Sequence, residues 1–92
     1  MNMSHDAEPA AAATFEVTVL LFAALREQHG NDRVGRQVPA GSTVKALYET
    51  MFPKTAHGRM PVMFAVDEAY AAPTTVLHDG AVVAFLPPLG GG

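Results

Sequence analysis

Cysteine is absent from this 92-residue chain, and so is tryptophan. The lack of cysteine excludes disulfides, thiolate nucleophiles and cysteine-based metal sites, and it gives no sign of an oxidising compartment. With 49% hydrophobic residues, the chain still has enough apolar material for one modest core. We therefore expect a single small domain that lacks an enclosed enzyme cleft.

Positive charge is scarce: six Lys and Arg stand against nine Asp and Glu, for a net charge of −3. The chain has no basic stripe, which argues against nucleic-acid binding. No apolar run approaches the length of a bilayer span, so no membrane association is expected. The first residues are acidic and lack the basic and apolar regions of a signal peptide, which favours a cytoplasmic protein.

Catalytic and metal-binding patterns are also missing from the body of the chain. The four histidines have no pair at ligand spacing, so no metal site is expected; they are His5, His29, His57 and His78. Asp67 and Glu68 are adjacent, and we interpret them as solvated turn residues rather than an acid–base pair. Ser42 and Thr43 fit a helix cap better than a nucleophile.

The hydrophobic pattern predicts an α+β fold. Strands are expected at 15–22, 33–38, 61–66, around Tyr70 and at 81–86, with helices at 23–29 and from Ser42 or Thr43 to Pro53. This order is typical of a mixed sheet of about five strands with one long helix packed across it. The first and last strands are the most apolar, so we expect them to form the central pair, and we expect the last strand to be covered on both faces.

The two ends of the chain differ from its body. Residues 1–14 are predicted to be a disordered leader, residues 15–88 the domain, and residues 89–92 a flexible tail. Pro87 and Pro88 cannot extend a sheet ladder, so they should end the last strand. Gly90, Gly91 and Gly92 lack a Cβ and could thread a narrow channel. The tail is thus either a frayed terminus or an arm offered to a partner's active site.

Three blocks of sequence resemble a known family. They are 18–23 followed by Leu25-Arg26-Glu27, then His78-Asp79-Gly80, and finally 83–88 before the terminal diglycine. They resemble the small subunit of molybdopterin synthase, which is the MoaD branch of the ubiquitin-like sulfur carriers; the sister branch, ThiS, serves thiamine synthesis. The resemblance runs from about Phe15 to Gly92, and the Pro-Pro pair favours the molybdopterin branch.

This resemblance implies a β-grasp fold and a function at the last residue. The carboxylate of Gly92 would be adenylated with ATP by a MoeB-like activating enzyme and converted by a sulfur donor to a thiocarboxylate. The tail would then enter the MoaE-like large subunit and donate sulfur to cyclic pyranopterin monophosphate. The carrier itself would bind no cofactor, the catalytic groups would lie on the partners, and two carriers would flank a dimer of large subunits in a heterotetramer.

The resemblance also implies an apolar docking patch beside the tail, formed by Phe22, Tyr70 and Leu86 and leading to Pro87 and Pro88. This chain departs from the family pattern, because Tyr70 replaces an aliphatic residue, Leu86 often corresponds to a phenylalanine, and Asp67 to an asparagine. Core packing is the alternative role for Phe22 and Leu86. Three other functions stay open: a carrier for thiamine or another sulfur pathway, a ubiquitin-like protein modifier, and a plain binding module.

Overall fold

The computed structural model describes residues 13–54 and 59–88. The elements, in chain order, are β1 (Thr14–Leu21), α1 (Ala23–His29), β2 (Arg33–Pro39), α2 (Val44–Met51), β3 (Met63–Val66), β4 (Ala69–Ala71) and β5 (Val82–Leu86). The predicted order of strands and helices is confirmed, with boundaries that differ by one or two residues. β1 begins at Thr14, so the first strand reaches one residue into the segment expected to be a leader.

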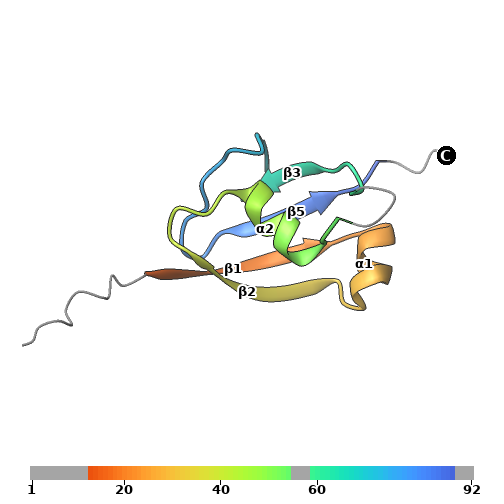
Figure 1. Cartoon of the computed structure of the whole chain (residues 1–92), viewed down its shortest axis with the longest axis horizontal. Helices are drawn as coiled ribbons and strands as arrows, with labels where there is room; N and C mark the ends of the chain where they lie inside the picture. The colour runs from red at the N-terminus through yellow and green to blue at the C-terminus, as the bar shows by residue number, and fades with distance from the viewer. Residues whose placement is uncertain (1–12, 55–58, 89–92) are drawn as a thin grey trace, which may run out of the picture.

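The strands form one mixed sheet in the order β2-β1-β5-β3-β4. β1 and β5 are parallel and central, as expected from their apolar sequences, and the other neighbours are antiparallel. Figure 1 shows α2 lying across one face of this sheet, with α1 at the end of β1. This is the β-grasp arrangement that the family resemblance implied.

Local sequence explains where the helices begin and end. Gly30 has a φ of 94°, a left-handed conformation that suits glycine, and its N–H bonds to the Arg26 carbonyl at the end of α1. At the start of α2, the Thr43 hydroxyl accepts a hydrogen bond from the N–H of Ala46 at 3.1 Å. α2 ends before Phe52 and Pro53, since proline cannot continue a helix.

The core lies between α2 and one face of the sheet. Its centre is an aromatic cluster in which the ring of Tyr48 lies 5.0 Å from that of Phe85 and 5.8 Å from that of Phe64. The Tyr48 hydroxyl donates to the Met60 carbonyl, so this buried ring keeps a partner for its polar atom. Burial raises the pKa of Tyr48. The helix is therefore held to the sheet mainly by apolar packing.

α2, with eight residues, is the longer of the two helices and packs across the sheet as expected. One expectation needs correction. β5 is central but it is not covered on both faces: Val83 and Phe85 are buried under α2, whereas Val82, Ala84 and Leu86 on the other face are half-buried. The physical reason is that both helices leave this second face of the sheet uncovered, and the apolar residues there remain within reach of solvent.

Candidate functional site

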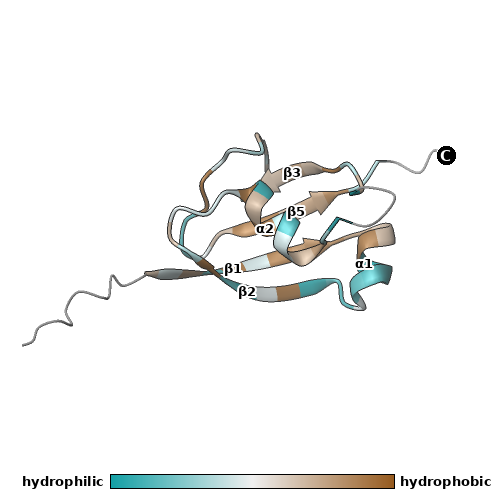
Figure 2. Ribbon diagram, in the orientation of Figure 1, coloured by the Kyte–Doolittle hydropathy of each residue, from teal (hydrophilic) through white to brown (hydrophobic). Residues whose placement is uncertain are grey.

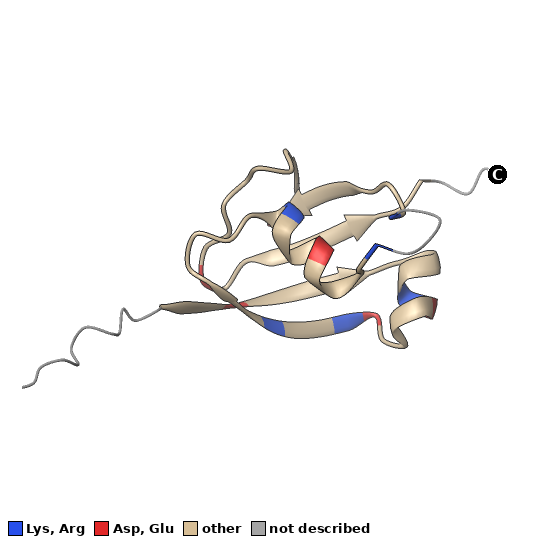
Figure 3. Cartoon of the chain, viewed as in Figure 1, with Lys and Arg blue, Asp and Glu red and all other residues tan. Residues whose placement is uncertain are grey.

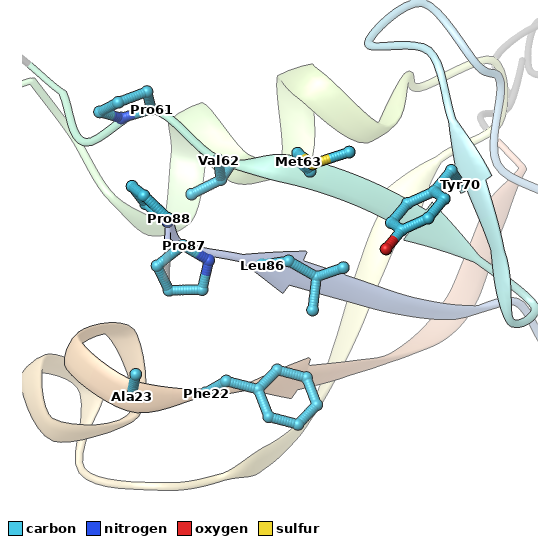
Figure 4. Close-up of a pocket in the computed structure, with 9 residues that line it drawn as sticks. All are labelled: Phe22, Ala23, Pro61, Val62, Met63, Tyr70, Leu86, Pro87 and Pro88. Atoms are coloured by element: carbon cyan, nitrogen blue, oxygen red, sulfur yellow. The ribbon is translucent and has the colours of Figure 1, made fainter. Parts of the chain in front are cut away.

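An open apolar groove of about 790 Å³ lies where β5 ends and the tail begins. We call it the tail groove. Phe22 and Ala23 form one wall, Pro61, Val62 and Met63 form the other, and Leu86, Pro87 and Pro88 lie between them, with Tyr70 at one end (Figure 4). The groove thus leads directly to the two prolines that precede the tail.

Strand register explains why residues distant in sequence meet in this groove. Leu21 of β1 is paired with Phe85, so Phe22 follows beside Leu86. Met63 of β3 is paired with Leu86 from the opposite side. Tyr70 of β4 reaches the groove because β4 pairs with β3, where Tyr70 lies opposite Ala65. Side chains alternate between the two faces of a strand, and these residues fall on the face that α2 does not cover.

The groove exposes large apolar side chains to solvent. Phe22 is 44% exposed, Met63 57% and Tyr70 74%, and they lie side by side rather than scattered over the surface. A contiguous patch of this kind marks an interaction surface in most soluble domains. We therefore interpret the groove as a docking site for another molecule.

None of the described residues that line the groove carries a charge. Its lining residues include no Asp, Glu, Lys, Arg or His, and the Tyr70 hydroxyl is the polar group among their side chains. Figure 3 places most of the charged residues on α1, β2, α2 and the loops, with Glu16 on β1, whereas β3 and β5 have none, and Figure 2 shows the same contrast in hydropathy. Binding here would depend on apolar contact rather than on ion pairs.

The structure places five of the sequence-predicted site residues together. Phe22, Tyr70, Leu86, Pro87 and Pro88 all line the tail groove. Phe22 and Leu86 are therefore not core residues, which was the alternative role. Gly90, Gly91 and Gly92 lie outside the described residues.

Sequence reasoning missed the wall formed by Pro61, Val62 and Met63, together with Ala23. The sequence did indicate a second apolar surface here, because every residue of 61–66 is apolar. This pattern is expected when both faces of a strand meet apolar neighbours. The pairing of β3 with β5, which puts Met63 beside Leu86, was not predicted and could not be read from that pattern alone.

A polar cluster holds the opposite end of β5. Asp67 and Glu68 form the two-residue turn between β3 and β4, with φ values of 53° and 71°. The Asp67 N–H donates to the Val82 carbonyl, and the Val82 N–H donates to the Asp67 carboxylate at 3.0 Å. Asp67 is thus more than the solvated turn residue that the sequence suggested, because it fastens the β3–β4 turn to the start of β5.

His78 completes this cluster. Its Nε2 donates to the Asp67 carboxylate at 2.6 Å, and its Nδ1 donates to the Asp79 carbonyl at 2.8 Å. Both partners are acceptors, so this geometry favours the protonated imidazole, in which both ring nitrogens are donors. The hydrogen bond to Asp67 raises the pKa of His78, and the hydrogen bond from the Val82 N–H lowers the pKa of Asp67. We assign this exposed pair a structural role.

The described part of the chain, 13–54 and 59–88, contains no group of three or more side chains able to hold a metal ion. Within the same residues, no helix is long and apolar enough to cross a membrane. The tail groove is therefore the feature on which a function can be argued.

A β-grasp domain with an uncharged groove leading to a glycine tail has the features of a ubiquitin-like carrier. The model of the ThiS family matches residues 19–92, which is most of the chain. A molybdopterin synthase sulfur carrier subunit from Arabidopsis thaliana is 30% identical over 83 residues, covering 87% of this chain and 86% of that protein. This chain belongs to the ThiS family, and it is a homologue of the MoaD-like sulfur carriers.

Solved structures agree on the fold. A putative molybdopterin converting factor, subunit 1, from Pyrococcus furiosus matches with a TM-score of 0.66 and 26% identity, covering 82% of this chain and 99% of that one. The small archaeal modifier protein 1 of H. volcanii matches with a TM-score of 0.67, at 21% identity over 82% of this chain and 99% of that one. The second likeness shows a shared fold alone.

Proposed function

We propose that this protein is the sulfur-carrier subunit of a molybdopterin synthase and that it acts in the cytoplasm. The observation that carries the proposal is the tail groove, which puts a large uncharged docking surface beside the prolines that begin the tail. The Arabidopsis relative supports the choice of pathway. The large synthase subunit and the activating enzyme are the proposed partners, with two carriers flanking a dimer of large subunits.

The proposed chemistry takes place at the carboxylate of Gly92. A carboxylate is a poor electrophile, so a partner enzyme first transfers AMP from ATP to it and releases pyrophosphate. Sulfide-level sulfur from a donor then attacks the acyl carbon, the bond to AMP breaks, and AMP leaves to give a thiocarboxylate. The large subunit positions this terminus against cyclic pyranopterin monophosphate, to which the sulfur is transferred. Since no cysteine is present, the chain has no thiol that could carry the sulfur instead.

The fold contributes docking and positioning rather than catalysis. Phe22 and Tyr70 lose exposed apolar area when a partner covers the groove, which stabilises the complex. Pro87 and Pro88 have a fixed φ, so they restrict the directions in which the tail leaves the groove. A partner that binds the groove therefore receives the tail at a defined place, and the reacting carboxyl group is brought to its active site.

Deletion of Gly91 and Gly92 tests the proposal. The truncated protein should melt at the temperature of the full chain but should neither be adenylated nor support molybdopterin formation in a mixture with the large subunit, the activating enzyme, ATP and a sulfur donor. An added residue after Gly92 should have the same effect. Intact mass of the active protein should show replacement of one oxygen by sulfur. Normal molybdopterin formation by the truncated protein would overturn the proposal.

A ubiquitin-like modifier is the second candidate, since its terminal glycine is activated by the same adenylation. The small archaeal modifier protein 1 of H. volcanii shares the fold of this chain, which is compatible with this candidate. The two functions differ in the nucleophile that attacks the activated acyl group. For a sulfur carrier it is the sulfur supplied by a donor, and for a modifier it is the amine of a lysine on another protein. Denaturing gels that show this chain covalently attached to other proteins would favour the modifier.

A further inference from the structure

We propose that Met63 is a site of reversible oxidation by peroxides, and that its oxidation switches the tail groove from docking-competent to docking-incompetent. The part that concerns docking rests on the function proposed above. The modification itself depends only on the exposure and chemistry of one side chain.

Met63 is the most accessible methionine among the described residues. It is 57% exposed on the wall of the tail groove, and Figure 4 shows its sulfur on the face that the other groove residues share. Met51 and Met60 are partly buried and pack against the hydrophobic core. Access of an oxidant to the sulfur limits methionine oxidation, so Met63 should react before Met51 and Met60.

The composition strengthens this assignment. The chain has no cysteine, so no side-chain thiol competes for the oxidant, and a thioether is the softest sulfur group available on its side chains. In the reaction, the sulfur of Met63 attacks hydrogen peroxide, the O–O bond breaks, one oxygen joins the sulfur as a sulfoxide and the other leaves as water. The sulfur is oxidised by two electrons and the peroxide is reduced by two.

The position of Met63 determines the consequence. Met63 is paired with Leu86 across the β3–β5 ladder, next to the two prolines of the groove. A sulfoxide oxygen there is a strong hydrogen-bond acceptor, whereas among the described lining residues only Tyr70 has a polar side-chain group. Covering that oxygen with an apolar partner would remove its hydrogen bonds to water without replacement. Oxidation should therefore weaken docking and leave the core intact.

The first experiment treats the purified chain with dilute hydrogen peroxide and maps every methionine by peptide mass. The protein is first shown by intact mass to carry a plain carboxylate, so that no sulfur on the tail consumes the peroxide. Met63 should be oxidised about tenfold faster than Met51 and Met60. Oxidation of all three at equal rates would overturn the assignment of Met63 as a selective site.

The second experiment measures binding of the peroxide-treated protein to the large synthase subunit. Wild type and the matched control Met60→Leu should lose about tenfold in affinity, and a methionine sulfoxide reductase should restore it. Peroxide should leave the affinity of Met63→Leu equal to that of the same variant before treatment, whatever the substitution itself does to binding. Untreated Met63→Gln should bind weakly with an unchanged melting temperature. If peroxide lowers the affinity of Met63→Leu as much as that of wild type, the proposed role of Met63 in the switch is wrong. If untreated wild type fails to bind, the proposed function is at fault instead.

Discussion

The two faces of β5 have different roles: one packs in the core and the other lines the tail groove. Phe85 points toward α2, is fully buried and contacts the rings of Tyr48, Phe52 and Phe64 at centroid distances of 5.0 to 6.3 Å. Leu86, one residue later, points to the other face and lines the tail groove. Because side chains alternate along a strand, a step of one residue separates the group that stabilises the fold from the group that meets a partner.

Replacement of Phe85 by alanine should have the largest effect on stability. Loss of this buried ring removes apolar contact and leaves a cavity, which should lower the free energy of unfolding by about 3–5 kcal/mol. A small domain has little stability to lose, so the variant should be partly unfolded at room temperature. Urea unfolding followed by circular dichroism measures this change. The matched variant Leu86→Ala should cost much less, and an equal cost would contradict the division between the two faces.

The polar cluster at the start of β5 should give a smaller effect that depends on pH. The pKa of His78 is raised above 6.5 in the folded state. Its contribution to the free energy of unfolding is therefore fully present below pH 6.5 and is lost as the pH rises through the folded-state pKa. The pKa of Asp67 is lowered below 3.8, so its contribution is fully present above 3.8 and is lost as the pH falls through the folded-state value. The pair therefore stabilises the fold most between pH 3.8 and pH 6.5.

The variant His78→Gln tests this window. Urea unfolding should show the largest loss of stability relative to wild type between pH 3.8 and pH 6.5. This loss should shrink at high pH, where wild-type His78 is neutral. The effect should be modest, since the two side chains are 60% and 48% exposed and the pair is screened by solvent. A deficit that does not change with pH would mean that the pair contributes through packing alone.

Replacement of Tyr70 by lysine should have the smallest effect on stability and a large effect on docking. Tyr70 is 74% exposed on the short strand β4, so the free energy of unfolding should change by about 0.5 kcal/mol or less. The new ammonium group would have to lose its water inside an uncharged groove, which should weaken binding of the large subunit by about tenfold or more. Calorimetric titration measures this affinity. Tyr70→Phe keeps the ring and should bind nearly as wild type does; unchanged binding of Tyr70→Lys would exclude the groove as the docking site.

Most of the fold and five of the nine residues that line the groove could be predicted from the sequence. The strands were recognisable because β-branched and aromatic residues cluster in short runs, and the helix starting after Thr43 because a capping hydroxyl precedes residues at helical spacing. Phe22, Tyr70 and Leu86 were found through a family resemblance. Met63 was missed because its neighbour across the sheet, Leu86, lies 23 positions later in the chain.

The cluster of Asp67 and His78 shows the same limit. A histidine and an aspartate that lie eleven positions apart have no characteristic spacing in sequence. Their contact depends on the β3–β4 turn meeting the segment that precedes β5. Sequence therefore assigned both residues to solvent-exposed turns, and only their positions in the folded chain revealed the hydrogen bonds.

The sequence by itself determined the local properties of this protein: the absence of thiols, the order of strands and helices, and the proline pair that ends the last strand. These features depend on backbone preferences and on the chemistry of single residues. The tertiary structure alone decided which face of β5 is covered, which residues form the groove and which groups hold its other end. Those outcomes depend on pairing between strands far apart in the chain, where register and helix position select which apolar residues are buried and which remain exposed.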